Sequence, residues 1–183
     1  IFSNVEDVDT LILSKLWENF NNPIVVEVCR DTENYEDVVN QAIINETEQI
    51  VLIGHGTEGG LLNQRLDGYI IDSRMVQFLR GKDIIGIWCN ASNFADRYDL
   101  TGFFTSMFIS NSRELIECGF QTFDNCDDEI RRQNQIFASR INQLLSTNTP
   151  SRDWSTILFD SLNNEERFVY YNNNPLGLEE EDC

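Results

Sequence analysis

Three short runs of apolar, largely β-branched residues mark the first half of the chain. They cover residues 24–29, 50–53 and 84–88, and polar or amphipathic stretches separate them. Runs of this length that are apolar at successive positions are typical of strands buried on both faces, as in a parallel sheet covered by helices. The pattern therefore predicts three parallel strands of one sheet.

The stretches between these runs predict the connections. Residues 35–45 place apolar side chains on one face at helical spacing, and residues 73–79 predict a shorter helix of the same kind. Residues 61–72 fit a loop or hairpin that turns near Asp67 and Gly68. Strands that alternate with helices predict an α/β fold, a three-layer sandwich in which helices flank a mostly parallel sheet.

The second half of the chain carries one strong helical pattern. Residues 127–145 are acidic at the start and carry an apolar stripe, which predicts the best helix of the chain. Residues 103–109 fit either a strand or a short helix. Residues 168–171 predict a late strand, and residues 172–175 predict the turn that ends it.

Composition indicates an ordinary soluble domain. The chain has 183 residues, of which 41% are hydrophobic and 24% are charged, and a chain of this length suits one domain. We expect that domain to cover residues 1–178, with residues 179–183 as a solvated acidic tail. No run approaches the roughly 18 apolar residues of a membrane span, and residues 1–7 lack the pattern of a signal peptide.

Five cysteines at irregular spacing, with no CxxC pair, do not form a disulfide framework. They suit a reducing compartment, and we expect a cytoplasmic location. Because the chain has a single histidine, a Cys/His zinc site is not expected, and we predict neither a metal nor a cofactor.

The net charge of −18, from 31 acidic and 13 basic residues, is unusual. It argues against nucleic acid as a partner, because phosphate binding needs clustered Lys and Arg. The charge fits simple solubility, and it also fits a field that attracts basic substrates or Ca²⁺. Both interpretations remain open at this point.

Two residues with catalytic chemistry follow buried strands. His55 comes directly after residues 50–53 and one glycine, and Cys89 comes directly after residues 84–88. Functional groups of α/β sheets gather beyond the carboxyl ends of the strands. A cysteine attacks as its thiolate and needs a base beside it, for which histidine is the usual choice. The amides of Gly56 and Cys89 could then stabilise a developing oxyanion.

Structural roles are the alternative for each residue alone. A cysteine after a strand is often a small buried hydrophobe, and a histidine in a glycine-rich turn is often structural. The pairing favours chemistry, because the only histidine of the chain and a cysteine both directly follow buried strands. The remaining cysteines lack this setting: Cys29, Cys118, Cys126 and Cys183.

The two blocks resemble the caspase-like superfamily of cysteine peptidases, which includes caspases, metacaspases, gingipains, clostripain and separase. The resemblance rests on Ile-Val-Leu-Ile-Gly-His-Gly at residues 50–56 and on Ile-Ile-Gly-Ile-Trp-Cys-Asn-Ala at residues 84–91. It covers residues 24–110. The resemblance implies a dyad of His55 and Cys89, an oxyanion hole from the Gly56 and Cys89 amides, and strict selectivity for the residue before the cleaved bond.

The chain also departs from the caspase pattern. Trp88, Asn90 and Ala91 surround the cysteine in place of the signature Gln-Ala-Cys-Arg-Gly, and the His–Cys spacing is shorter than the roughly 50 residues of caspases. A short, bacterial-style member of the superfamily fits better than a true caspase.

The residue preference is predicted from charge. In clostripain and gingipains, which this chain resembles, a buried Asp binds the Arg or Lys before the cleaved bond. The acidic composition of this chain favours a similar pocket for a basic side chain. The candidates are Asp72, Asp96 and Asp99, all expected in loops near the strand ends, although surface solvation is the favoured explanation for each of them alone. Ser110 and Asn111 are further candidates if residues 103–109 form the next strand.

Three other functions compete with the peptidase, whose partner would be a protein or peptide substrate. The chain could be a catalytically silent caspase-like module for regulation or protein interaction, because a fold does not fix a function. An α/β-hydrolase is excluded, because the GxSxG nucleophile elbow is absent. A non-enzymatic acidic binding protein has only the net charge and the tail in its favour.

Overall fold

The computed structural model describes residues 1–3, 8–17, 24–29, 31, 33–46, 49–106, 108–117, 119, 121–147 and 149–161. Eight strands are β1 (Phe2–Ser3), β2 (Glu27–Val28), β3 (Gln49–Ile53), β4 (Gly56–Thr57), β5 (Gly60–Leu62), β6 (Tyr69–Ile71), β7 (Asp83–Ile87) and β8 (Gly102–Phe104) in the described residues. The helices there are α1 (Val8–Leu11), η1 (Ile12–Trp17), α2 (Tyr35–Asn45), α3 (Val76–Leu79), α4 (Ala91–Tyr98), α5 (Ser112–Glu117), α6 (Cys126–Leu145), η2 (Ser151–Asp153) and α7 (Trp154–Ser161).

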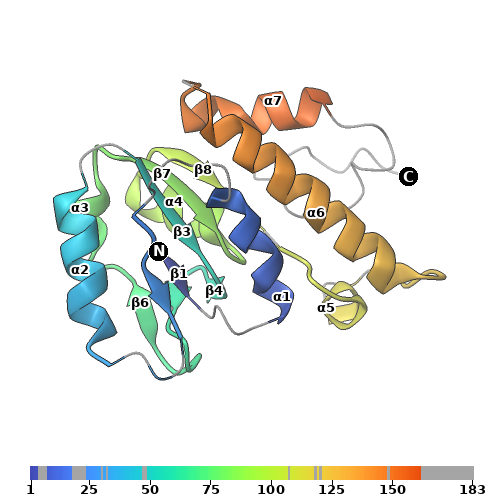
Figure 1. Ribbon diagram of the computed structural model, residues 1–183, viewed down its shortest axis with the longest axis horizontal. Coiled ribbons are helices and arrows are strands. Elements are labelled where there is room, and N and C mark those ends of the chain that lie inside the picture. Colours follow the sequence, from blue (N-terminus) through green and yellow to red (C-terminus); the bar gives the residue numbers. More distant parts are fainter. Residues whose placement is uncertain are drawn as a thin grey trace.

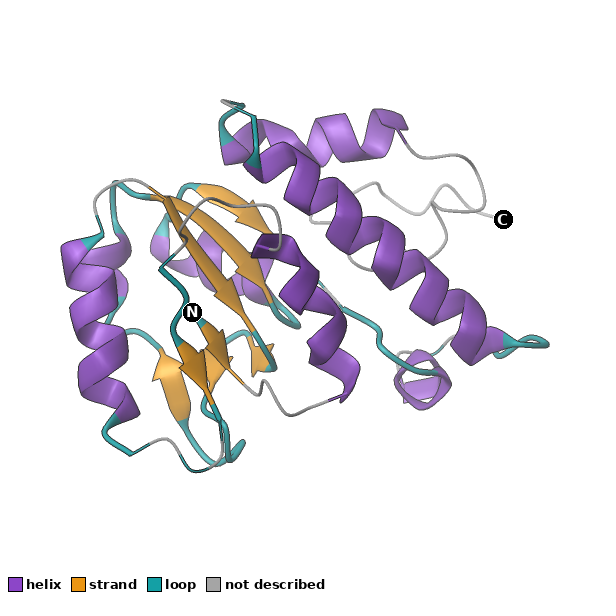
Figure 2. Cartoon of the chain, in the orientation of Figure 1, coloured by secondary structure: helices purple, strands orange, loops and turns teal. Residues whose placement is uncertain are grey.

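Five strands form one parallel sheet in the order β2-β1-β3-β7-β8 (Figures 1 and 2). The pair β3–β7 is the longest and runs in register from Gln49 opposite Asp83 to Ile53 opposite Ile87. The predicted parallel sheet is therefore confirmed, and the chain is an α/β protein. β1 separates β2 from β3, so the first two predicted strands are near neighbours rather than adjacent ones.

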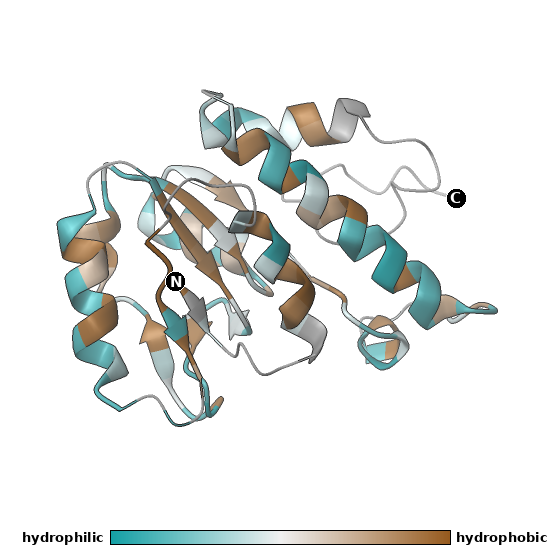
Figure 3. Ribbon diagram, viewed as in Figure 1, coloured by the Kyte–Doolittle hydropathy of each residue, from teal (hydrophilic) through white to brown (hydrophobic). Residues whose placement is uncertain are grey.

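Both faces of this sheet are apolar. On β3, Ile50 and Leu52 pack into one hydrophobic cluster, and Val51 and Ile53 contact a second. Because side chains of a strand alternate between faces, two clusters on one strand mean a core on each side. Figure 3 shows the resulting apolar colour along the central strands.

Different helices complete the two clusters. The first contains buried side chains of α2, α3 and α4 together with residues of β5 and β6. The second contains side chains of η1 and α6 and, from α7, Trp154 and Leu158. The helices thus divide between the two faces of the sheet, with α6 and η1 on one side and α2, α3 and α4 on the other.

A small antiparallel sheet of β4, β5 and β6 follows β3. The predicted hairpin between residues 61 and 72 is confirmed, since β5 and β6 pair on either side of the loop that contains Asp67 and Gly68. The side chain of Asn63 shapes this loop, because its Oδ1 accepts bonds from the backbone N–H groups of Arg65 and Asp67. The hairpin connects β3 to α3 without entering the main sheet.

Several predicted elements keep their positions with changed ends. The helices predicted at 35–45 and 127–145 are confirmed, and the helix at 73–79 is regular only over α3. Of the range 103–109, residues 103 and 104 end β8, and residues 105, 106, 108 and 109 form neither helix nor strand. The elements predicted at 168–175 and the tail at 179–183 lie outside the described residues.

One predicted strand is largely wrong. Within residues 24–29 only β2 is a strand, and Ile24 is 85% exposed. The physical reason lies in the pairing, because β2 is paired with β1 only at Glu27, opposite Phe2, and at Val28, opposite Ser3. Apolar residues that precede the paired positions therefore extend past the sheet edge. None of the described helices has both the length and the apolar character that crossing a membrane requires.

The paired core predicts a clear stability difference between two leucines. Leu52 on β3 is fully buried, whereas Leu11 on α1 is 52% exposed. Leu52→Ala should lower the free energy of unfolding by about 2–5 kcal/mol, because it leaves a cavity in the first cluster. The matched control Leu11→Ala should change it by no more than about 0.5 kcal/mol. Denaturant unfolding measures both, and equal losses would contradict the assignment of the core.

Candidate active site

His55 and Cys89 occupy equivalent positions on adjacent strands. Ile53 and Ile87 are the last paired residues of β3 and β7, and each of the two candidates follows its strand by two residues. The N–H of Gly54 still donates to the carbonyl of Ile87 at 3.2 Å, so the strands remain side by side there. Neighbouring strands lie about 4.8 Å apart. Both residues therefore emerge together at the carboxyl edge of the sheet.

The candidate nucleophile borders the second hydrophobic cluster. Cys89 is half-buried and packs against that cluster, to which Ile85 and Ile87 of the same strand belong. It thus continues the alternation of β7 on the face that α6 covers. His55 is also half-buried, and its backbone carbonyl accepts the N–H of Leu62 at 2.9 Å.

Trp88 connects the two candidate residues. Its indole Nε1–H donates to the carbonyl of Thr57 at 3.1 Å, and the ring lies against Gly56. A Cβ at position 56 would stand 2.0 Å from Cδ1 of the indole, so only glycine fits there. The residue after His55 and the residue before Cys89 are therefore in direct contact.

Thr105 fixes the backbone of Trp88 in turn. Its Oγ1 accepts the N–H of Trp88 at 3.1 Å and donates to the carbonyl of the same residue at 2.8 Å. Both groups are buried, and a buried backbone group without a partner is costly. Phe94 and Phe104 enclose the indole edge-on at centroid distances of 5.9 and 6.3 Å. The hydrogen bonds of Thr105 and the two phenylalanine rings thus fix Trp88, the residue before Cys89.

A sharp turn follows Cys89. Asn90 has φ 65°, in the left-handed region, and α4 begins at the next residue. Asparagine is one of the few residues that tolerate this conformation, and such positions cluster at functional sites. The N–H of Asn90 also donates to the carbonyl of Ser106. Cys89 is therefore presented at a tight junction between strand and helix.

The thiol of Cys89 contacts the segment that leads from β8 to α5. Its Sγ lies 3.7 Å from the carbonyl oxygen of Phe108, to which the S–H donates. A nucleophile has to leave this carbonyl and pass its proton to a base before it attacks. Apo sites often show such loose geometry.

The amide of Gly56 does not take part in the ladder with β5. Gly56 pairs with Leu61 in antiparallel register, and the N–H of Leu62 donates to His55. Because bonded and non-bonded pairs alternate along such a ladder, the N–H of Gly56 points away from β5. The assignment of the Gly56 and Cys89 amides to an oxyanion hole stays a prediction.

A cavity of about 420 Å³ opens beyond Phe108. Ser110 and Asn111, two of the predicted pocket residues, line it. The other walls come from η1, from the start of α5 and from one face of α6, and the remaining lining residues are Ile12, Ser112, Arg113, Asp127, Arg131 and Asn134. The segment that touches the Cys89 thiol therefore continues directly into a cavity wall.

Hydrogen bonds hold this wall in place. Asn134, which is 3% exposed on α6, donates from Nδ2 to the carbonyl of Ile109 at 2.9 Å. Glu114 accepts both the N–H and the hydroxyl of Ser110, at 2.8 and 2.7 Å. The hydroxyl of Ser110 is thus engaged inside the wall and does not face a ligand as a donor.

Asp127 plays the same structural part at the other end of the wall. The N–H of Ser112 donates to its Oδ1 at 2.6 Å, and this bond lowers the pKa of Asp127 below its usual value. The carboxylate is therefore ionised and already bound to the backbone of α5. Figure 1 shows α5 beside the first turn of α6.

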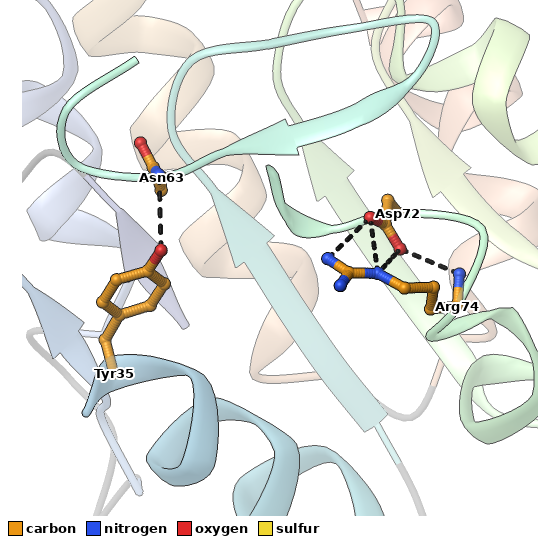
Figure 4. A network of polar contacts seen from close by, with 4 residues as sticks. All are labelled: Tyr35, Asn63, Asp72 and Arg74. Carbon is orange, nitrogen blue, oxygen red and sulfur yellow. Dashed lines mark hydrogen bonds and ion pairs between the residues drawn. The ribbon is translucent and has the colours of Figure 1, made fainter. Parts of the chain in front are cut away.

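The structure does not bring the three acidic candidates to this cavity. Asp72 follows β6 and binds Arg74, with Oδ2 2.9 Å from the guanidinium Nη2 (Figure 4). Its charge is thus already matched by a neighbour. In the same view, Asn63 donates to the hydroxyl of Tyr35 at 3.3 Å, which ties the hairpin to α2.

Asp96 and Asp99 depart from their expected places. Asp96 lies within α4 rather than in a loop, and it is exposed. Asp99 follows α4 at its C-terminal end, just before β8 begins opposite Ile84. That end of the helix faces the amino edge of the sheet. A helix rises about 1.5 Å per residue, so Asp99 stands roughly 12 Å further along α4 than its first residue.

Some residues of the site carried no usable sequence signal. Trp88 was visible as the end of an apolar run, but its contact with Gly56 depends on pairing between distant segments. Thr105 and Arg131 look like ordinary polar positions of a loop and a helix. The left-handed turn at Asn90 is the one feature that its residue type suggests.

No family model, curated protein or solved structure matches the chain. Among the described residues, no three His, Cys, Asp or Glu side chains gather in a way that could hold a metal ion. The site is therefore interpreted from its own residues.

The two hydrogen bonds between the Thr105 hydroxyl and the backbone of Trp88 give a direct prediction. Thr105→Val keeps the shape of the side chain but leaves the buried N–H and C=O of Trp88 without this partner. We expect the free energy of unfolding to fall by about 1–3 kcal/mol. Thr101→Val is the control. Thr101 is exposed and directly precedes β8, so this change should be nearly neutral. Denaturant unfolding of both variants checks this, and equal small losses would show that the hydroxyl is dispensable.

Proposed function

We propose that this chain is a cysteine endopeptidase of the caspase-like kind, with Cys89 as nucleophile and His55 as general base. The observation that carries the proposal is the register of β3 and β7. Ile53 pairs with Ile87, and each candidate follows two residues later at the same edge of the sheet. Side chains at such equivalent positions can come within the hydrogen-bond reach that nucleophilic catalysis requires, and this supports the proposal.

The reaction uses the two residues in sequence. His55 takes the thiol proton, and the Cys89 thiolate attacks the carbonyl carbon of the scissile bond. His55 then gives that proton to the leaving amine as the C–N bond breaks, which leaves a thioester on Cys89. A water molecule attacks the thioester while His55 takes its proton, and the acid product leaves as the thiol is restored.

The backbone amides of Gly56 and Cys89 would stabilise the tetrahedral oxyanion in both steps. The direction of the Gly56 N–H, away from β5, supports this assignment. Rigid supports also favour it, because Trp88 and Thr105 hold the backbone next to both amides. Such preorganisation matters, since an oxyanion hole acts without rearranging during the reaction.

The proposal includes a fold of the caspase-like kind, in which helices cover both faces of the sheet as three layers. Hydrophobic clusters on both faces of the parallel sheet support a three-layer, caspase-like sandwich. The partner would be a protein or peptide that lies along the carboxyl edge of the sheet, beside the cavity of α5 and α6.

A catalytically silent module is the second candidate. One observation favours it: the Cys89 thiol donates to the carbonyl of Phe108 and packs against the second cluster. A thiol that stays in this arrangement would serve packing rather than catalysis. The two candidates differ in the reactivity of Cys89.

The test compares turnover with stability. Cys89→Ala should abolish cleavage of an unbiased peptide library, and His55→Ala should reduce it by about 100-fold or more. Both variants should keep nearly the wild-type thermal midpoint, because the two residues are only half-buried. Cleavage is followed by mass spectrometry of the library, and unfolding by circular dichroism.

Cys29→Ala is the matched control, since Cys29 also follows a strand of the same sheet and is half-buried. It should retain full turnover. Iodoacetamide labelling at neutral pH completes the test, because an activated thiolate reacts much faster than an ordinary thiol. If Cys89 of the folded wild-type protein labels no faster than Cys29, and no peptide is cleaved, the silent module is correct.

A further inference from the structure

The turn that follows Gly56 is closed by a threonine side chain. The hydroxyl of Thr57 accepts the backbone N–H of Gly59 at 3.0 Å. A threonine hydroxyl that binds the N–H two residues later closes a tight turn. Thr57 also pairs with Gly60 in the β4–β5 ladder. The side chain and the ladder therefore fix the peptide groups between Thr57 and Gly59 in one orientation.

Tyr69 holds the hydroxyl of Thr57 in place. The two hydroxyl oxygens lie 2.8 Å apart and share a hydrogen bond. The phenol ring lies against Gly59, where a Cβ would stand 2.6 Å from the phenol oxygen and 2.9 Å from Cζ. Tyr69 belongs to β6 and pairs with Leu62 of β5. Because a β-branched side chain has few rotamers, these contacts leave Thr57 a single one.

The carbonyl of Thr57 faces the strand that ends before Cys89. It accepts the indole Nε1–H of Trp88 at 3.1 Å, and the indole ring lies against Gly56. The direction of this carbonyl depends on the turn that the Thr57 hydroxyl closes. Thr57 is therefore the residue at which the contacts of the small sheet and the contact to Trp88 meet.

The N–H of Gly56 depends on these neighbours for its direction. It points away from β5 and takes no part in the ladder. Glycine restricts its own backbone less than any other residue, so the peptide groups beside it have to be fixed by contacts of other residues. An oxyanion donor acts only if it is held about 3 Å from the oxygen on which charge develops. A small tilt of the segment at Gly56 would therefore weaken it.

We propose that Thr57 is a positioning residue of the oxyanion hole, and that its hydroxyl, held by Tyr69, keeps the N–H of Gly56 directed at the reacting carbonyl oxygen. The inference rests on the proposed peptidase function. Neither side chain touches the substrate, because both act through the peptide groups that follow Gly56. Loss of the hydroxyl slows only those steps in which an oxyanion forms.

Two reagents separate oxyanion stabilisation from the reactivity of the thiol. With 4-nitrophenyl acetate, the Cys89 thiolate attacks the carbonyl carbon, and the resulting oxyanion collapses to an acetyl thioester as 4-nitrophenolate leaves. With iodoacetamide, the same thiolate displaces iodide from a saturated carbon and forms a thioether without an oxyanion. The ratio of the two rate constants therefore reports the oxyanion hole.

The experiment uses the full chain. Absorbance of 4-nitrophenolate follows acetylation, and mass spectrometry locates and quantifies both adducts at Cys89. Cys89→Ala is the blank for reactions at other nucleophiles. Circular dichroism of each variant shows that it is folded.

Thr57→Val keeps the shape of the side chain and removes both hydrogen bonds of the hydroxyl. It should slow acetylation of Cys89 by about 10-fold or more, since complete loss of an oxyanion donor costs about 100- to 1,000-fold. The iodoacetamide rate should stay unchanged. Thr57→Ser keeps the hydroxyl and should keep the wild-type ratio. Tyr69→Phe should lower the ratio by less, because Thr57 still binds the N–H of Gly59.

Tyr98→Phe is the matched control. Tyr98 is also half-buried, and its ring packs on Phe94, which itself contacts the indole of Trp88. Its ratio should equal that of the wild type.

The positioning proposal is wrong, while Cys89 remains the nucleophile, if Thr57→Val leaves the ratio unchanged or slows both reactions equally. It is also wrong if Thr57→Ser behaves like Thr57→Val. Should Thr57→Val not fold, Tyr69→Phe decides by the same criteria. If Cys89 of the wild type reacts with neither reagent faster than Cys29, the proposed function itself fails, and the role of Thr57 fails with it.

Discussion

The contact between Trp88 and Gly56 is the constraint on which the arrangement of the candidate site depends. A parallel sheet aligns the ends of β3 and β7, but the chain leaves the ladder directly afterwards. Beyond that point the indole binds the carbonyl of Thr57 and lies on Gly56, so the two departing segments stay together. Thr105 then holds the backbone of Trp88 through two hydrogen bonds. Without this chain of contacts, register alone would not hold the segments after β3 and β7 together.

The sequence predicts the parts of the fold that local patterns determine. Apolar runs at β3 and β7 and the helical stripes of α2 and α6 lead to the correct elements, because burial on a sheet or helix face imposes a period. β1 was missed, since two paired residues are too short for any period. The run at 24–29 was misleading for a related reason: apolar residues predict burial only where a partner strand reaches them, and Ile24 lies past the edge.

In the candidate site too, local patterns predict some residues, and contacts between distant segments determine the others. His55 and Cys89 could be found because each ends a readable strand, and their relation follows from parallel pairing. Of the pocket, only Ser110 and Asn111 could be named in this way. Its walls combine η1, the start of α5 and a face of α6, so its charge depends on which side chains of distant helices meet. Composition gives an average over the whole surface, whereas a cavity samples only the few charges within one screening length.

The close approach at position 56 also links the residues that positions 56, 60 and 88 can carry in related chains. A Cβ there would stand 2.0 Å from the indole of Trp88 and 2.7 Å from the carbonyl oxygen of Gly60. Homologous chains that carry a side chain at 56 would therefore need a smaller residue at 88 and a displaced turn at 60. Positions 56, 60 and 88 form one steric unit, and in related sequences they should covary as a unit even where the helices around them diverge.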